Sequence, residues 1–456
     1  MGPVKDSGHD FEKPGRDRRS TRGTEIPVPE PVTAETDRLT RIKAVFRVAT
    51  GNFLEMYDFT VFGYYAAAIG RTFFPQSSEF AVLMLSFVTF GVGFLIRPLG
   101  ALVLGAYIDR RGRRAGLILT FALMSIGTLS IACVPGYAAI GLAAPLLVVA
   151  GRLLQGFSAG AELGSISVYL SEIATPGHKG FYTSWQNASQ QCAVVAAALL
   201  GVGLNSSLTR EQMDAWGWRI PLLLGCAIIP FLFMMRRALP ETGEFLARKP
   251  HFSTRDVMRS LTANWQVVAL AAMLIAMSTS NFYLITVYTP TFGRSVLHLA
   301  ERDSLAVTLS TGVSNFLWLP IMGALSDRVG RRPLLFCCTI LVLSTAYPAL
   351  SWLAGSPSFL RLLSVQLWLS FLYGSYNAGM VVYLTEIIPA DVRASGFSLA
   401  QSVAAALFGG FTPAICTYFI RLTNNPASPG LWLSLTAAIA LTATLLCSRL
   451  QPRSAA

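Results

Sequence analysis

Long apolar segments alternate with short polar ones along the chain from about residue 45 onward. Each apolar segment has about 18 or more residues, which is long enough to cross the hydrocarbon core of a membrane as one helix. We therefore expect an all-α membrane protein with twelve transmembrane helices. The predicted spans are 45–69, 81–105, 115–135, 140–166, 181–204, 218–237, 265–290, 304–325, 333–353, 360–384, 394–420 and 430–449.

Two polar motifs occur twice, at matching positions in the two halves of the chain. The loop sequence GAYIDRRGRR at 105–114 returns as GALSDRVGRR at 323–332, and YLSEI at 169–173 returns as YLTEI at 383–387. Motifs that repeat in one order at nearly one spacing indicate structurally equivalent halves. Six spans in each half would make them parallel repeats, an arrangement typical of secondary transporters that bind substrate between the halves.

The same pattern divides the chain into five parts. Residues 1–40 are rich in charged residues, Pro and Gly without apolar periodicity, so we expect a disordered cytosolic N-terminal tail. The remaining parts are an N-terminal six-helix bundle at 41–237, a cytosolic linker at 238–264, a C-terminal six-helix bundle at 265–449 and a C-terminal tail at 450–456.

Composition and charge agree with insertion into a lipid bilayer. The chain is 53% hydrophobic and 13% charged, well below the roughly 25% charged residues of a soluble domain. The net charge of +12 would suit a nucleic-acid partner, but the basic residues lie in short loops between apolar spans. With the N-terminus in the cytosol, 27 Lys and Arg residues fall on the cytosolic side and 7 on the other. This excess predicts that both termini are cytosolic, and it removes the reason to expect a nucleic acid.

Four ionisable residues fall inside predicted spans, namely Glu55, Asp58, Arg97 and Arg152. A charge at mid-membrane is costly, so each is a candidate functional residue. At about 1.5 Å per residue, all four lie near the middle of the membrane. Glu55 and Asp58 are one helical turn apart, which disfavours double ionisation. We therefore expect them to couple transport to a cation, with H⁺ and Na⁺ both open from the residues alone.

The two arginines are candidate ligands for an anionic substrate, because guanidinium donors match the geometry of carboxylates. The alternative is a structural ion pair with Glu55 or Asp58. Polar residues at similar depth complete the predicted substrate site: Gln155, Gln186, Asn187, Gln190, Tyr288, Tyr376 and Asn377. Other polar residues in the second half include Tyr283, Tyr373 and Gln401. Residues of this kind more often form hydrogen bonds between helices than bind a substrate.

Several motifs resemble those of a known group of transporters. The doubled G-x-x-x-D-R-x-G-R-R loop resembles the signature of the major facilitator superfamily, and GRLLQGFSAG at 151–160 resembles its fourth-helix motif. GNFLEMYDF at 51–59, together with YLSEIATP at 169–176, is similar to the metabolite:H⁺ symporter family. The likeness runs from about residue 44 to 448 and is greatest to bacterial citrate–proton symporters and tricarballylate transporters.

The resemblance implies uptake of citrate or a related tricarboxylate through the bacterial inner membrane by alternating access, and it favours the proton as the coupling ion. It also implies a cytosolic gate, which would contain Asp109, Arg113, Asp327, Arg331, Glu172 and Glu386. A betaine-like osmolyte, a shikimate-like acid and Na⁺-coupled citrate uptake are the alternatives within this class.

Other classes of function find little support in the sequence. There is no phosphate-binding glycine loop and no nucleophile paired with a base, and the four histidines (His9, His178, His251, His298) all lie outside the spans. The seven cysteines are scattered without metal-ligand spacing. We therefore expect no enzyme activity, no cofactor and no metal site. A channel is disfavoured because gate motifs repeated in both halves imply that the halves rock.

Overall fold

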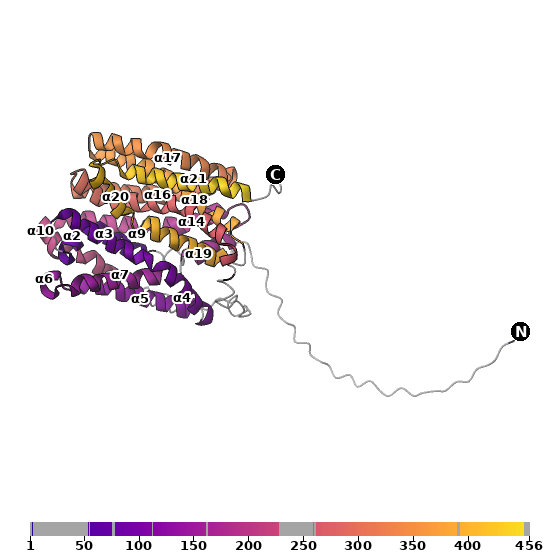
Figure 1. Ribbon diagram of the computed structural model, residues 1–456, viewed down its shortest axis with the longest axis horizontal. Helices are drawn as coiled ribbons and strands as arrows, with labels where there is room; N and C mark the ends of the chain where they lie inside the picture. The colour runs from indigo at the N-terminus through magenta and orange to yellow at the C-terminus, as the bar shows by residue number, and fades with distance from the viewer. Residues whose placement is uncertain are drawn as a thin grey trace, which may run out of the picture. The chain divides into compact units, whose positions relative to one another are not determined.

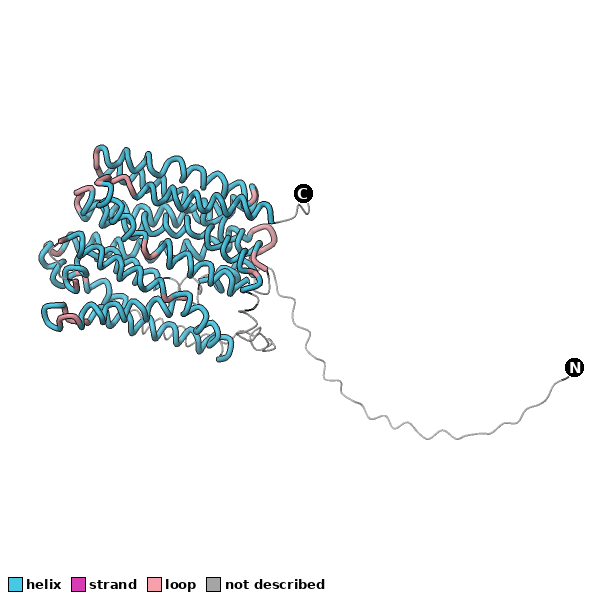
Figure 2. Tube along the Cα trace, viewed as in Figure 1, coloured by secondary structure: helices cyan, strands magenta, loops and turns pink. Residues whose placement is uncertain are grey.

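The computed structural model describes residues 2, 53, 55–74, 78–111, 113–160, 163–227, 259, 261–389 and 393–450. Within these ranges the chain is helical and contains no strand (Figure 2). The predicted tails and most of the predicted linker lie outside the described residues.

The first half of the chain, up to residue 227, begins with helical residues 55–64. Its named helices are α2 (Ala66–Phe73), α3 (Glu79–Leu95), α4 (Arg97–Arg111), α5 (Arg113–Cys133), α6 (Tyr137–Ile140), α7 (Ala143–Ala159), α8 (Leu163–Glu172), α9 (Lys179–Ser207), α10 (Arg210–Gln212) and η1 (Met213–Gly217). Residues 219–227 are helical again.

The second half, from residue 261, is composed of α14 (Trp265–Phe282), η2 (Tyr283–Tyr288), α15 (Thr289–Thr291), η3 (Phe292–Val296), α16 (Glu301–Val329), α17 (Arg331–Gly355), α18 (Phe359–Ile387), α19 (Arg393–Ala404), η4 (Ala405–Gly409), α20 (Thr412–Thr423) and α21 (Pro429–Leu450). The long helices run side by side (Figure 1). The end of α4 and the end of α21 lie at one end of the helices, and α6 and α10 lie at the opposite end.

Helices of membrane-spanning length follow the hydropathy pattern. Seven of the described helices are both long and apolar enough to cross a membrane, and Ile118–Cys133 and Ala143–Ala159 are shorter apolar helices. All twelve predicted spans coincide with helical segments, at least in part. Many of their large apolar side chains, such as Leu142, Leu146 and Leu360, are exposed on the outside of the protein, where lipid would cover them.

The break between α3 and α4 determines where Arg97 lies. Ile96 ends α3, and Pro98 follows directly after Arg97. Proline has no N–H to donate, and its ring clashes with the carbonyl one turn earlier, so the helix bends there. Arg97 therefore lies at the bend, near the middle of a segment that is apolar over Glu79–Leu104.

Glycines in the fourth-helix motif let α7 pack directly against α3 and α4. A Cβ added to Gly156 would overlap the Gly93 carbonyl, and one added to Gly160 would overlap the Arg97 carbonyl. These backbones touch because no side chain intervenes, as small residues allow where helices meet in a membrane. The contact holds Arg97 and Arg152 on adjacent helices.

The two halves meet along several helix pairs. The helix α9 packs along α16, and α3 packs against η4 and α20. At the first of these interfaces Asn315 Nδ2 donates to Gln191 Oε1 at 3.1 Å, and Ser370 donates to Asn315 Oδ1 at 2.7 Å. The space between the two halves contains the polar cavity described next.

Candidate functional site

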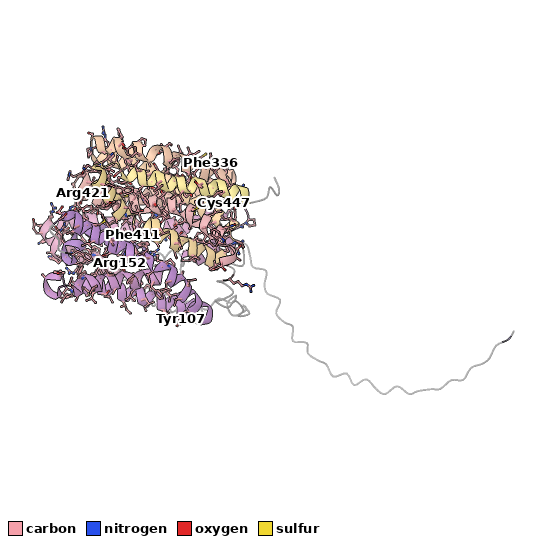
Figure 3. The ribbon with its side chains drawn as sticks, in the orientation of Figure 1. Tyr107, Arg152, Phe336, Phe411, Arg421 and Cys447 are labelled. Atoms are coloured by element: carbon pink, nitrogen blue, oxygen red, sulfur yellow. The ribbon has the colours of Figure 1, made fainter. Side chains whose placement is uncertain are left out.

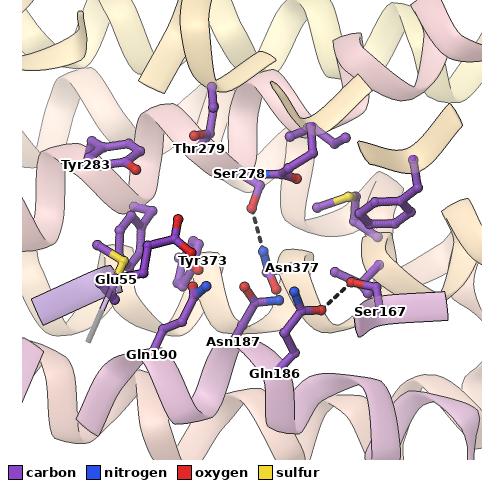
Figure 4. A pocket seen from close by; sticks show the side chains of 18 of the residues that line it. Glu55, Ser167, Gln186, Asn187, Gln190, Ser278, Thr279, Tyr283, Tyr373 and Asn377 are labelled. Atoms are coloured by element: carbon purple, nitrogen blue, oxygen red, sulfur yellow. Dashed lines mark hydrogen bonds between the residues drawn. The ribbon is translucent and has the colours of Figure 1, made fainter. Parts of the chain in front are cut away.

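A cavity lies between the two halves and is lined by helices from both (Figure 4). It contains about 700 Å³ of space not filled by protein atoms, including its opening to solvent. Its polar lining residues are Glu55, Arg97, Ser167, Gln186, Asn187, Gln190, Ser278, Thr279, Tyr283, Tyr373, Asn377 and Gln401.

One face of α9 supplies the amides of the first half. Gln186, Asn187 and Gln190 project from this helix into the cavity. Gln186 accepts a hydrogen bond from the hydroxyl of Ser167 on α8, which orients its amide. Asn187 and Gln190 are only partly buried, so their amides are open to a molecule in the cavity.

The second half lines the opposite side with hydroxyls and one oriented amide. Asn377 on α18 donates from Nδ2 to Ser278 Oγ on α14 at 2.7 Å (Figure 4). Tyr283 and Tyr373 lie beside it in the cavity wall. Nothing in the sequence distinguishes these tyrosines, or Ser278, from other polar residues of the second half, because hydroxyls in membrane helices often bond to their own backbone.

Arg97 carries the positive charge of the cavity wall. Its Nη2 lies 3.5 Å from Glu55 Oε1. Its Cζ lies 4.2 Å from the ring centroid of Phe94 and 4.6 Å from that of Phe59. Ring faces attract a cation without competing for its N–H donors, and Nε has no hydrogen-bond partner. Among the described lining residues, Arg97 is the one cation and Glu55 the one anion.

Arg152, which also lies in the first half of the chain (Figure 3), is in a different environment. Its side chain is 0% exposed and is not part of the cavity lining. Nη1 donates to Gln155 Oε1 at 2.7 Å and lies 4.0 Å from Asp58 Oδ2. Gln155 in turn donates to Asp58 and, at 3.0 Å, to Thr128. The ring centroids of Phe59 and Phe62 lie 4.6 and 4.3 Å from its Cζ.

The predicted substrate residues therefore fall into two groups. Arg97, Gln186, Asn187, Gln190 and Asn377 meet at the cavity, whereas Arg152, Gln155, Tyr288 and Tyr376 do not line it. Two of the latter bond within the protein, since Tyr376 donates to the Leu274 carbonyl at 2.9 Å and Tyr288 accepts from Thr417 at 3.2 Å. Of the two predicted coupling acids, Glu55 faces the cavity and Asp58 is in the Arg152 cluster.

The repeated loop motif of the second half contacts the first half at the predicted cytosolic end. Asp327 accepts hydrogen bonds from the backbone N–H groups of Gly180 at 2.8 Å and Phe181 at 3.0 Å. These are among the first N–H groups of α9, which have no partner within the helix. Arg331 lies 2.8 Å from Asp327 and 3.5 Å from Glu386. The structure thus joins three of the six predicted gate residues.

For the other three predicted gate residues, the described part of the chain gives no such contact between the halves. Glu172 is exposed at the end of α8, and the side chains of Asp109 and Arg113 lie outside the described part of the chain.

This architecture matches known transporters. The sequence profile of a family described as "Sugar (and other) transporter" matches residues 44–256 and 248–447. The E. coli xylose transporter XylE superposes with a TM-score of 0.72 at 17% identity, covering 90% of this chain and 98% of that one. The chain is thus an all-α membrane transporter, and it belongs to the sugar (and other) transporter family of the major facilitator superfamily.

Among individual relatives, the citrate-proton symporter of Klebsiella pneumoniae is 60% identical over 404 residues, which is 89% of this chain and 91% of the relative. The citrate-proton symporter of Salmonella typhi is 58% identical over 414 residues, or 91% and 95% of the two chains. The alpha-ketoglutarate permease of E. coli is 31% identical over 381 residues, or 82% and 86%.

Proposed function

We propose that this protein imports citrate together with protons by alternating access between its two halves. The observation that carries the proposal is Arg97, a cation in the wall of the central cavity that is paired with a carboxylate and surrounded by amide donors. Such a site suits a small polyanion. The high identity to two citrate-proton symporters supports citrate as that anion and the proton as the coupling ion.

The Arg97–Glu55 pair supplies a mechanism for coupling. A citrate carboxylate that reaches Arg97 competes with Glu55 for the same guanidinium. Once Glu55 loses this partner in a partly desolvated cavity, its charged form is destabilised and it takes up a proton. Binding of the anion and of the proton then favour each other, which is the linkage that symport requires.

The second charged cluster has a different role in this proposal. Arg152 and Asp58 carry opposite charges, and the uncharged Gln155 bridges them by hydrogen bonds, next to the rings of Phe59 and Phe62. We assign Arg152 to fixing the packing of the helix at 55–64 against α7, which positions Glu55. Asp58 remains a second candidate for proton binding, because it is the one carboxylate in the described cluster.

The contacts of Asp327 account for closure at the cytosolic end. Its carboxylate caps the positive end of the α9 dipole, so this contact between the halves is charge-assisted. It can exist only while the halves are close at that end, and it must break when the cavity opens there. We place the protein in the bacterial inner membrane with both termini in the cytosol, following the excess of basic residues in the cytosolic loops.

Two alternatives are separated from this proposal by one experiment. Proline/betaine transporters are 28–29% identical to this chain, and Na⁺ could replace the proton. Uptake of citrate, tricarballylate and betaine into proteoliposomes should be measured under imposed H⁺ or Na⁺ gradients. Citrate accumulation driven by the H⁺ gradient alone is the expected result. Betaine uptake without citrate uptake, or a strict need for Na⁺, would refute the proposal.

A further inference from the structure

One oxygen in the cavity wall has no partner. Asn377 is 5% exposed and lines the cavity. Its Nδ2 is held by Ser278 at 2.7 Å, whereas its Oδ1 is buried without any hydrogen-bond partner. A buried acceptor left unpaired keeps its full desolvation penalty. With Nδ2 donated to Ser278 Oγ, the acceptor Oδ1 is left for a donor from the cavity.

The chemistry of this oxygen restricts what can satisfy it. An amide oxygen only accepts hydrogen bonds, and ionised carboxylates are acceptors as well. The carboxylates of citrate therefore suit Arg97 and the amide donors of Asn187 and Gln190, but they cannot pair with Asn377 Oδ1. The central hydroxyl of citrate is the donor that can. Tricarballylate has the same three carboxylates and lacks this hydroxyl.

We infer that Asn377 is the residue that distinguishes a hydroxy-tricarboxylate from its deoxy analogue, by accepting the substrate hydroxyl. The inference rests on the proposed function and adds a specificity determinant to it. A site built to pair with a substrate hydroxyl discriminates strongly against an analogue that lacks it, because a buried polar group then stays unpaired.

The test compares citrate and tricarballylate as substrates of the full-length protein in proteoliposomes under an inward H⁺ gradient. We expect the wild type to have a KM for citrate that is lower by roughly tenfold or more than that for tricarballylate. Asn377→Leu, which has a similar size and no acceptor, should raise the citrate KM by about that factor and change the tricarballylate KM less than about twofold. Ser364→Ala, an exposed position on the same helix, is the control and should leave both values unchanged.

The other outcomes are equally informative. If Asn377→Leu raises both KM values by the same factor, the amide donates to a carboxylate and the inference is wrong. An unchanged preference for citrate, or a wild type without preference, also overturns it. If Asn377→Leu fails to fold, Ser278→Ala tests the same point. Without the Ser278 hydroxyl the Asn377 amide can rotate, so the KM values for citrate and tricarballylate should become more alike. An unchanged ratio of the two KM values contradicts the inference. A wild type that transports neither acid would instead refute the proposed function.

Discussion

Arg97 Nη2 lies 3.5 Å from Glu55 Oε1 in the wall of the central cavity. The pair joins the only two charged groups among the described lining residues. In the proposed function, an entering carboxylate exchanges with Glu55 at the guanidinium. This exchange makes one residue pair responsible for both recognition and coupling.

Removal of the guanidinium should abolish recognition of the substrate. We expect Arg97→Gln to reduce citrate uptake at least a hundredfold, because a bound carboxylate would lose its charge-assisted donors. Arg97→Lys should retain partial activity with a raised KM, since an ammonium group lacks the bidentate geometry of arginine. Uptake at varied citrate concentration measures both effects. The control is Arg421→Gln, on α20 and outside the cavity lining. Near-normal citrate uptake by Arg97→Gln would exclude Arg97 from the substrate site.

Neutralisation of Glu55 should separate citrate movement from the proton gradient. In Glu55→Gln the carboxamide cannot bind and release a proton, whereas Arg97 stays available to citrate. Citrate counterflow, which needs no net proton movement, is expected to persist. Accumulation driven by an inward H⁺ gradient should be lost. Gradient-driven accumulation at the wild-type level in this variant would transfer the coupling role to another group, with Asp58 the first to examine.

Disruption of the cluster formed by Arg152, Gln155 and Asp58 should lower the thermal stability of the protein. Removal of one partner of a buried ion pair typically costs about 3–5 kcal/mol, because the other charge remains uncompensated. Arg152→Met and Asp58→Asn should each lower the Tm of the detergent-purified protein. The double variant should be more stable than the sum of the two losses predicts. Strictly additive losses would show that the two side chains do not compensate each other.

The cytosolic contact can be tested by accessibility. Asp327→Asn keeps one acceptor but removes the charge that caps α9, so the halves should separate more often at that end. Ser184 is 1% exposed and lies next to Gly323. A Ser184→Cys thiol in a background without other cysteines should therefore react faster with a membrane-impermeant maleimide in Asp327→Asn. Arg328→Gln, at the exposed neighbouring position, is the control, and equal reaction rates in all three proteins would argue against the gate.

Hydropathy and the motif repeat were sufficient to predict the helices, because span length is set by membrane thickness. The proximity of Arg97 and Arg152 was also predictable, since rise per residue is fixed and both Cζ atoms lie 4.6 Å from the Phe59 ring centroid. The direction in which a side chain points was not. Arg97 and Arg152 have the same chemistry and both lie against Phe59, yet Arg97 lines the cavity and Arg152 does not. Rotation of a helix about its axis depends on tertiary packing, such as the Gly93–Gly156 contact.

Because tertiary packing decides the direction of each side chain, the sequence also did not indicate every residue that lines the cavity. Tyr283, Tyr373 and Gln401 line the cavity, while Tyr288 and Tyr376 are bonded elsewhere. All five are polar residues of the second half at comparable depth. Their neighbours decide which of them face the cavity, and those neighbours come from helices far apart in the chain.

The most direct test of this account is the number of protons that the purified protein takes up when citrate binds, measured with a pH indicator in weakly buffered detergent solution. Arg97→Gln, which should not bind citrate, corrects for protonation of citrate itself. We predict net proton uptake by the wild type and none by Glu55→Gln at saturating citrate. Equal proton uptake by both proteins, or citrate binding by the wild type without any proton, would contradict the exchange at Arg97.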